Sequence, residues 1–192
     1  MSTVAVREIT PDEFLEMGDD AKGFELIDGQ LVERHVSMES SRVNLRVGRH
    51  LGDYADTHGG WVFESELGYR CFPAKPKQVR KADVSYISFA RMPVETYEDE
   101  GFCTTCPEVA VEVLSPNDNA YEVDAKTDEW LGAGVREVWL ANPEARVVRV
   151  HRADGTVTLF READTLTSPL LPGFAVPVVA LFRRPTAAGG TP

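Results

Sequence analysis

Three charged residues, Asp83, Glu112 and Lys126, are of the types that metal-assisted hydrolysis uses. Glu112 interrupts the otherwise apolar run Val109–Leu114 in the stretch EVAVEVLSP. Such a run is typical of a strand that is covered on both faces of a sheet. A carboxylate in that setting is unfavourable unless a cation, a metal ion or a hydrogen-bond donor meets it. The function of Glu112 therefore depends on its partners.

Lys126 is a candidate partner for Glu112. It lies three residues after Val123 and four residues before Trp130, so it shares the apolar face of the helix expected over 115–134. A lysine on a helix face that packs against a sheet is unusual unless an acid pairs with it. The preceding strand offers Glu112 as that acid.

Asp83 opens the next candidate strand, DVSYISF. If this strand lies beside the strand of Glu112, the two carboxylates converge near one point. Converging carboxylates hold hard divalent cations such as Mg²⁺ or Mn²⁺, and a nearby lysine can orient a water or stabilise transition-state charge. The same spacing also fits a buried Glu112–Lys126 ion pair with Asp83 at the end of a strand, so both interpretations stay open here.

The elements that would position these residues follow from periodicity and turn signals. The stretch 108–141 reads as a strand, a helix ending at Gly134 and a second strand, a β-α-β unit whose strands should be parallel. We expect a short helix from Thr10, a hairpin around Asp28-Gly29 and a long amphipathic helix that ends at Gly59-Gly60. We also expect strands over 61–72, 83–89, 146–152 and 156–160, and a last short element over 177–182.

Composition indicates one globular domain of mixed α/β class, which we place at residues 1–184 with a frayed tail over 185–192. No stretch approaches the ~20 apolar residues of a membrane span. Three cysteines do not suggest a disulfide framework and favour a reducing cytoplasm. The net charge of −11 means that nucleic acid, if bound, must meet a local basic patch rather than a basic surface.

Two groups of basic residues could form such a patch. Arg42, Arg46 and Arg49 make a stripe along one side of the long helix, although such a stripe is more often a solvated face. The stretch from Arg70 to Lys81 holds five basic residues and no acid, and its prolines indicate an exposed loop. From this loop we take Lys77, Arg80 and Lys81 as candidate nucleic-acid-binding residues.

The sequence CTTC at Cys103–Cys106 has the spacing of half a zinc site or of a redox pair. A redox motif should open a helix after a strand, whereas Pro107 and a strand follow this one. A zinc site needs two further ligands, for which Cys71 with His58 or His35 is conceivable. Partly buried loop thiols are the simpler interpretation.

Taken in order, these segments resemble the Uma-two family of restriction-endonuclease-like proteins in the PD-(D/E)XK nuclease superfamily. The resemblance runs from about Thr10 to Phe182 and is carried by FELIDGQLVE, ADVSYI, PEVAVEVLSPND and AKTDEWLGAGVREVWLANPEARVVRVHR. It implies a restriction-endonuclease-like fold, in which a mixed central sheet is flanked by helices and holds a divalent-metal site.

The resemblance also implies roles for individual residues. Asp83 and Glu112 match the two acids of the family motif, and Lys126 matches a lysine that the family supplies from the following helix, since Leu114 stands where the superfamily lysine usually lies. Glu25 matches a further site glutamate, and the backbone carbonyl of Val113 would be an additional metal ligand. One departure is Ala82, which replaces the proline before the first acid. All four acidic and basic side chains are nevertheless present.

The sequence thus predicts a nuclease that hydrolyses phosphodiester bonds of DNA with Mg²⁺ or Mn²⁺. A homodimer is expected if both strands of a duplex are cut. The main rival is a nuclease-fold module that binds nucleic acid or a protein partner and cleaves little. The net negative charge of the chain favours this binding module, while the complete set of Asp83, Glu112 and Lys126 favours the nuclease.

Overall fold

A six-stranded mixed sheet forms the centre of the protein, which a computed structural model describes over residues 7–185. The strands lie in the order in which they follow one another along the chain. They are β3 (Trp61–Glu64), β4 (Val84–Ile87), β5 (Val109–Val113), β6 (Glu137–Asn142), β7 (Val147–Arg152) and β8 (Val157–Phe160). Only β5 and β6 pair in parallel, and the other neighbours are antiparallel. The expected β-α-β unit is therefore present, with α3 (Ala120–Ala133) as its crossover helix.

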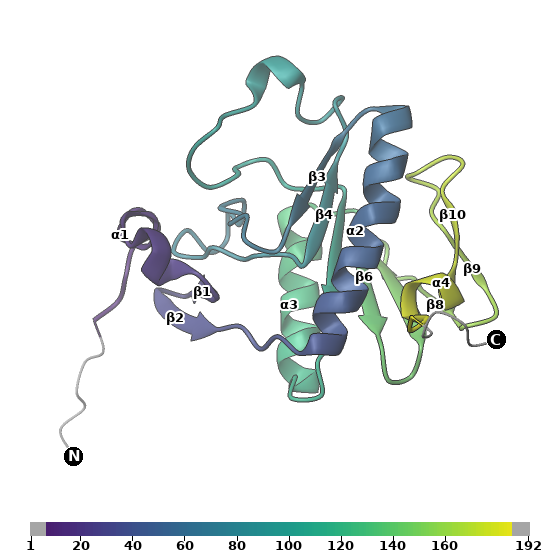
Figure 1. The fold of residues 1–192 in the computed structure, drawn as a ribbon. Coiled ribbons are helices and arrows are strands. Elements are labelled where there is room, and N and C mark those ends of the chain that lie inside the picture. Colours follow the sequence, from purple (N-terminus) through teal and green to yellow (C-terminus); the bar gives the residue numbers. More distant parts are fainter. Residues whose placement is uncertain (1–6, 186–192) are drawn as a thin grey trace.

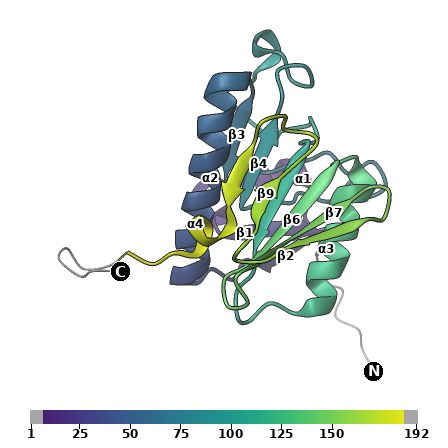
Figure 2. The same ribbon diagram turned by 90° about the vertical axis from the view of Figure 1, so that its right-hand side faces the viewer.

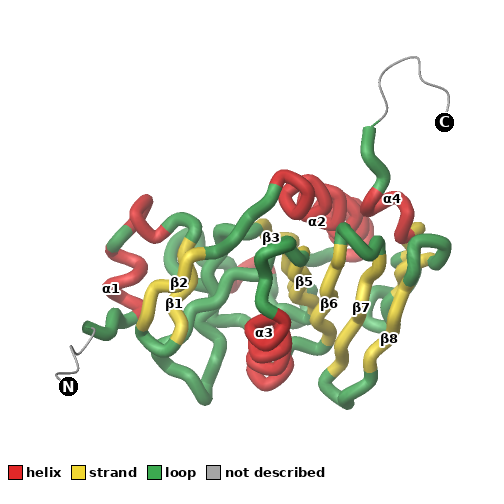
Figure 3. The backbone as a smooth tube through the Cα atoms, turned by 90° about the horizontal axis from the view of Figure 1, so that it is seen from below, coloured by secondary structure: helices red, strands yellow, loops and turns green. Residues whose placement is uncertain are grey.

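Two helices cover opposite faces of this sheet, as the view along its layers shows (Figure 3). On one face α2 (Met38–His58) packs the apolar stripe Val43, Val47 and Leu51 into a core with Val111 and Val113 of β5. On the other face α3 buries Trp130 among the alternate residues of the strands, such as Ala110, Val138 and Leu140. Because side chains of a strand alternate between faces, Glu112 projects on the α3 side.

The start and end of α2 follow from local chemistry. Ser37 is its N-cap and accepts a hydrogen bond from the Ser40 amide at 3.0 Å, while the Ser40 hydroxyl accepts from the Ser37 amide at 2.9 Å. This reciprocal arrangement is a capping box, which satisfies backbone donors that the first turn leaves free. At the other end Gly59 has φ +82°, a conformation that favours glycine. The expected stop at Gly59-Gly60 is thus observed.

The N-terminal part forms a separate hairpin to one side of α3 (Figure 1), where Glu25 of the hairpin reaches Lys126 in the middle of that helix. Helix α1 (Pro11–Glu16), capped by Thr10, and the 3₁₀ turn η1 (Gly18–Ala21) precede β1 (Phe24–Ile27) and β2 (Gln30–Glu33). Leu26 of β1 exchanges backbone hydrogen bonds with Val79, at 3.0 and 2.8 Å. This link fastens the hairpin to the segment that leads into β4, and so places β1 next to the centre of the sheet.

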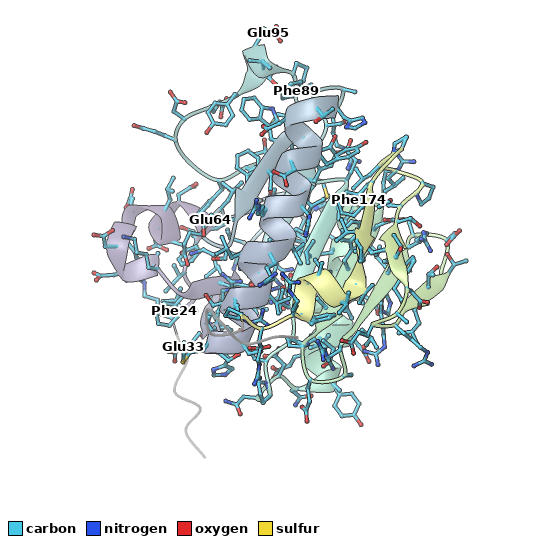
Figure 4. All side chains as sticks on the ribbon, turned by 45° about the vertical axis from the view of Figure 1, so that its right-hand side comes forward. Phe24, Glu33, Glu64, Phe89, Glu95 and Phe174 are labelled. Atoms are coloured by element: carbon cyan, nitrogen blue, oxygen red, sulfur yellow. The ribbon has the colours of Figure 1, made fainter. Side chains whose placement is uncertain are left out.

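The C-terminal part adds β9 (Thr165–Thr167), β10 (Ala175–Pro177) and α4 (Val178–Phe182) on the α2 side of the sheet (Figure 2). Phe174, labelled in Figure 4, meets Tyr54 of α2 edge-on with ring centroids 5.8 Å apart. The short β9–β10 pair was not predicted, and the expected last element is this short helix. Most of the tail expected over 185–192 lies outside the described residues.

Two other segments differ from expectation or carry no regular element. The stretch 61–72 forms only β3 and then isolated bridges at Tyr69. The acidic segment between β4 and β5 contains one short 3₁₀ turn, η2 (Val94–Thr96). In residues 7–185, no helix combines the length and the apolar character needed to cross a membrane.

Candidate active site

Glu112 of β5 lies at the centre of a buried cluster of charged side chains. Its Oε2 accepts a hydrogen bond from Nζ of Lys126 at 2.9 Å, and its Oε1 accepts one from the indole nitrogen of Trp130 at 2.9 Å. Both donors come from α3, four residues apart on one face. Glu112 is 8% exposed, so these donors compensate much of its desolvation.

Glu25 reaches the same lysine from the N-terminal hairpin. Its Oε1 is 3.0 Å from Nζ of Lys126 and accepts a hydrogen bond from the Lys81 amide at 2.7 Å. Its Oε2 accepts from Nη1 of Arg80 at 3.0 Å. The link between β1 and Val79 explains this placement, because it sets Glu25 beside the backbone of residues 80 and 81. Lys126 thus bridges Glu25 and Glu112.

Asp83 lies immediately before β4 and joins the cluster through the backbone of β5. Its amide donates to the carbonyl of Val111 at 3.0 Å, and its Oδ2 accepts from the amide of Val113 at 2.7 Å. These contacts fall on either side of Glu112. The other oxygen, Oδ1, accepts from Nη2 of Arg34 at 2.6 Å.

Arg34 is a member of the cluster that sequence reasoning missed. It follows β2, its side chain is 10% exposed, and it also donates to the carbonyl of Ser65 at 2.6 Å. A buried arginine needs a carboxylate partner, but the pairing of Arg34 with Asp83 spans 49 residues and leaves no local signal. Only its position directly after the predicted hairpin, which also carries Glu25, could have indicated Arg34 as a site residue.

The carboxyl groups of Glu112 and Glu25 ionise very differently. Burial raises the pKa of Glu112 to about 7, since the attraction of Lys126 is offset by repulsion from the carboxylates of Asp83 and Glu25. Burial also opposes the ionisation of Glu25, but Lys126, Arg80 and the Lys81 amide outweigh it and lower its pKa to about 2. Glu112 is therefore the under-compensated acid of the cluster.

Lys126 stays protonated in this setting. Burial opposes its charge, yet the nearby carboxylates of Glu112 and Glu25 raise its pKa above the ordinary value for lysine. A protonated lysine donates hydrogen bonds and stabilises negative charge, but it does not accept a proton. Lys126 can thus serve as an electrostatic group and not as a general base.

The donor set suits a hard divalent cation in its chemistry. Asp83, Glu112 and Glu25 offer carboxylate oxygens, the ligands that Mg²⁺ and Mn²⁺ prefer, and the raised pKa of Glu112 reflects burial that Lys126, shared with Glu25, only partly offsets. Within residues 7–185, however, no three His, Cys, Asp or Glu side chains are already arranged as a metal-binding group. Arg34 and Lys126 pair with these carboxylates, so a cation would have to displace or share the Arg34 contact to Asp83.

The loop from Arg70 to Lys81 is not the exposed basic loop that we expected. Arg80 and Lys81 are 6% and 4% exposed, which corrects that expectation for both. Glu129 of α3 accepts hydrogen bonds from Lys75 at 2.7 Å, from Gln78 at 2.8 Å and from Nε of Arg80 at 2.8 Å. Two of the five basic residues, Lys75 and Arg80, therefore fasten this loop to α3, and the other three pair with acids elsewhere in the chain.

The remaining candidate nucleic-acid-binding residues differ in their surroundings. Lys81 pairs with Glu66 at 2.8 Å, and Lys77, which is half-exposed, pairs with Glu8. Arg42 donates to the Phe182 carbonyl at 3.0 Å and Arg46 to the Ala180 carbonyl at 2.9 Å, so both hold α4 against α2. Arg49 is exposed. This stripe lies on the sheet face opposite to Glu112.

The cysteines are half-buried free thiols. Cys103 donates to the Thr105 carbonyl at 3.3 Å, and neither it nor Cys71 or Cys106 belongs to a metal-binding group among the described side chains. Burial raises the pKa of Cys103. These observations agree with partly buried loop thiols, the simpler of the two interpretations of CTTC.

Comparisons with known proteins agree with this architecture. A family model named Uma2 and described as "Putative restriction endonuclease" matches residues 11–179. The crystal structure of a "putative nuclease belonging to DUF820" from Anabaena variabilis ATCC 29413 is similar, with a TM-score of 0.75 and 22% sequence identity over 91% of this chain and 97% of that one. No curated protein matches the chain. At 22% identity the likeness establishes the fold, and the predicted mixed α/β, restriction-endonuclease-like architecture is confirmed.

Proposed function

Because this chain belongs to the Uma2 family of restriction-endonuclease-like proteins, we propose that it is a divalent-metal-dependent endonuclease acting on phosphodiester bonds of DNA. One observation carries the proposal. Three carboxylates from three different segments converge on the buried cluster around Lys126, and the central acid, Glu112, is left with a pKa of about 7. Acids with strongly perturbed pKa values cluster at functional sites, where burial and neighbouring charges tune them.

Each residue has a distinct role in the proposed hydrolysis. Asp83 and Glu112, with the carbonyl of Val113, would hold Mg²⁺ or Mn²⁺, and Glu25 would complete the surroundings of a metal-bound water. The bound cation supplies Lewis-acid stabilisation of the phosphoryl oxygens and lowers the pKa of a water molecule. Lys126, which remains protonated, donates to the negative charge that develops on the phosphate.

Arg34 has a role of its own in this proposal. Its guanidinium neutralises Asp83 in an ion pair of 2.6 Å. If Asp83 held a divalent cation instead, Arg34 would be free to pair with the phosphate, and a planar guanidinium suits two phosphate oxygens at once.

The test is cleavage of supercoiled plasmid and of single-stranded DNA with Mn²⁺ or Mg²⁺. Wild type is compared with Asp83→Asn, Lys126→Met and the control Glu122→Gln, which alters an exposed acid of α3 outside the cluster. We expect metal-dependent cutting by wild type and the control, and a loss of at least a hundredfold in the other two. Equal traces of cutting in all four proteins would indicate a contaminating nuclease and oppose the proposal.

A binding module remains the second candidate, and two observations favour it. The chain carries a net charge of −11, and Arg34 and Lys126 already neutralise part of the acid cluster. A module of this kind would bind nucleic acid or protein without Mn²⁺ and would not cut. Binding of labelled DNA in the presence of a chelator, with no cutting when Mn²⁺ is added, would favour it over the enzyme.

Oligomeric state is part of the proposal where both strands of a duplex are cut. One site per protomer cuts one strand, so a double-strand break by a single encounter requires a homodimer. Light scattering of the purified protein measures its mass directly. A mass near the 21.2 kDa of one chain, together with double-strand breaks, would show that two encounters suffice.

A further inference from the structure

An open groove of about 780 Å³ lies at the carboxyl ends of the two parallel strands, β5 and β6. Leu114, directly after β5, and Asn142, the last residue of β6, contribute to its wall, and Val123 of α3 contributes from the other side. Ligands of open α/β sheets bind at such carboxyl ends. The groove is thus placed where the fold most often receives a substrate.

The register of the sheet places the lining of the groove one strand away from Glu112. Glu112 pairs with Leu140 of β6, and Leu140 pairs with Arg149 of β7, so these three residues form one row across the sheet. Leu140 and Arg149 both line the groove. Since strands are about 4.8 Å apart, the backbone of Arg149 lies about 10 Å from that of Glu112. That span is comparable with the separation of nearby phosphates along one nucleic-acid strand.

Two groove residues on β7 have unused hydrogen-bonding capacity. Within the described part of the chain, Arg149 makes neither an ion pair nor a side-chain hydrogen bond, in contrast to Arg34, Arg80 and Arg152. Nε2 of His151 is shielded from solvent and has no hydrogen-bond partner among the described residues. The imidazole as a whole is only partly buried and lines the groove.

The charges around the groove argue against a simple phosphate channel. Asp124 and Glu144 are exposed at its edge, while Glu39 is engaged by Arg42 and Arg184, and Asp118 accepts from the Ser115 amide. The two closely spaced rows of phosphates of a duplex would be repelled by these acids. A single strand can place one phosphate on Arg149 and lay its base on the apolar floor of Leu140 and Val123.

We propose that this groove binds a single-stranded polynucleotide next to the cleavage site, with Arg149 holding a flanking phosphate and His151 contacting the neighbouring nucleotide. The proposal rests on the proposed nuclease function for the identity of the adjacent site. It adds a substrate class, an unpaired strand, and names two binding residues that lie outside the acid cluster.

The experiment measures binding and cutting separately. Fluorescence anisotropy follows a labelled deoxythymidine strand of about twelve nucleotides, and a duplex of equal length, with Ca²⁺ in place of Mn²⁺. The proteins are wild type, Arg149→Ala, Arg149→Lys and Arg161→Ala, a control that removes an exposed arginine outside the groove. Because the Arg149 side chain makes no hydrogen bond or ion pair among the described residues, its variants should fold, and circular dichroism verifies this.

We expect wild type to bind the single strand more tightly than the duplex. Arg149→Ala should weaken that binding about tenfold, the usual effect of removing a charged hydrogen bond, and Arg149→Lys should weaken it less. Arg161→Ala should bind as wild type does. Equal affinity of Arg149→Ala and wild type, tighter binding of the duplex, or no binding of either probe by wild type would overturn the proposal.

Cutting with Mn²⁺ separates this inference from the proposed function. If wild type binds the strand in an Arg149-dependent manner but never cuts it, the nuclease proposal fails and the groove assignment stands. If wild type cuts and Arg149→Ala cuts with unchanged KM, the groove assignment fails and the nuclease stands. The expected result is an increase of KM in Arg149→Ala that exceeds any change in kcat.

Discussion

Glu112 is buried among two other acids, and its surroundings leave its negative charge only partly compensated. Lys126 is shared with Glu25, and Arg34 is directed to Asp83, so no basic residue belongs to Glu112 alone. In a purely structural ion pair, a buried carboxylate can have a basic residue as a partner of its own, which fully compensates its charge. The imbalance therefore points to a cation or a proton that Glu112 takes up during function.

Replacing Glu112 with glutamine should make stability less dependent on pH. The pKa of Glu112 is about 7 in the folded protein against 4.5 as its ordinary value, so the folded state favours the neutral acid. The resulting stabilisation is complete below pH 4.5 and is lost as the pH rises through 7. Relative to Glu112→Gln, wild type should therefore lose about 3 kcal/mol of unfolding free energy between those limits.

Urea unfolding of both proteins at about pH 5 and about pH 8.5 measures this difference. Comparing the change with pH, and not the absolute stability, removes the constant effect of rearranging the contacts of Lys126 and Trp130. A Glu122→Gln control should follow wild type at both pH values, because Glu122 is exposed. Parallel stability of wild type and Glu112→Gln across this range would show that Glu112 is fully compensated.

Arg34→Met should create a protein that a divalent cation stabilises more than it stabilises wild type. The substitution leaves the Asp83 carboxylate with the Val113 amide as a partner but removes its charged one. Breaking a largely buried ion pair from one side costs about 2–3 kcal/mol. Mn²⁺ can replace the lost positive charge and recover part of this loss by binding the folded state.

Thermal unfolding with and without Mn²⁺ measures that effect. The increase of Tm on adding Mn²⁺ should be larger in Arg34→Met than in wild type and absent from the double variant Arg34→Met, Asp83→Asn. Lys126→Met is not a suitable control, because it disturbs two acids at once. If Mn²⁺ shifts neither protein, Asp83 does not take part in metal binding.

At the scale of elements, the parts of the fold that local patterns specify were predicted well. The stripe at Val43, Val47 and Leu51 predicts α2, and Asp28-Gly29 predicts the β1–β2 turn, where Asp28 and Gly29 both have positive φ. The apolar run around Glu112, the helix to Gly134 and the next strand predict the β-α-β unit. Each of these patterns lies within one short stretch of sequence, so it can be recognised without knowledge of contacts between distant segments.

What the sequence could not predict depends on contacts between distant segments. The basic loop before β4 looks exposed because Glu129, which fastens it, lies about fifty residues further on. Arg34 and Asp83 meet across a similar separation. The strands β9 and β10 contain three residues each, too few for an alternating pattern to appear. The roles of Glu25 and Val113 came from resemblance alone, since nothing in their local sequence indicates a site.

Ser37→Ala should destabilise the protein through the start of α2. The substitution removes the acceptor for the Ser40 amide and leaves backbone donors of the first turn unsatisfied. Loss of such a cap costs about 1 kcal/mol. The matched control is Ser41→Ala, which removes an exposed hydroxyl one turn later on the same helix. Urea midpoints that are equal for the two variants would show that the capping box contributes nothing measurable.

At the scale of the whole molecule, the net negative charge opposes the binding of nucleic acid, whereas the chemistry of the candidate site favours it. A chain of net charge −11 repels a polyanion at long range, and much of its basic charge is committed to internal ion pairs. The proposed recognition of nucleic acid would then rest on a few close contacts, at Arg149 and at a cation held by the acid cluster. Few phosphate contacts release few counterions, and the salt dependence of binding counts them.

We therefore expect the affinity for a single strand to depend only weakly on salt. Two phosphate contacts give a slope of log K against log salt concentration of about −1.4 for a single strand, and screening of the overall repulsion makes it shallower still. Arg149→Ala should reduce the magnitude of that slope by about 0.7, whereas Arg161→Ala should leave it unchanged. Anisotropy titrations across a range of NaCl concentrations supply the slope. A value steeper than about −4 would require a basic surface that residues 7–185 of one protomer do not supply at this groove, and a second protomer would be the place to seek it.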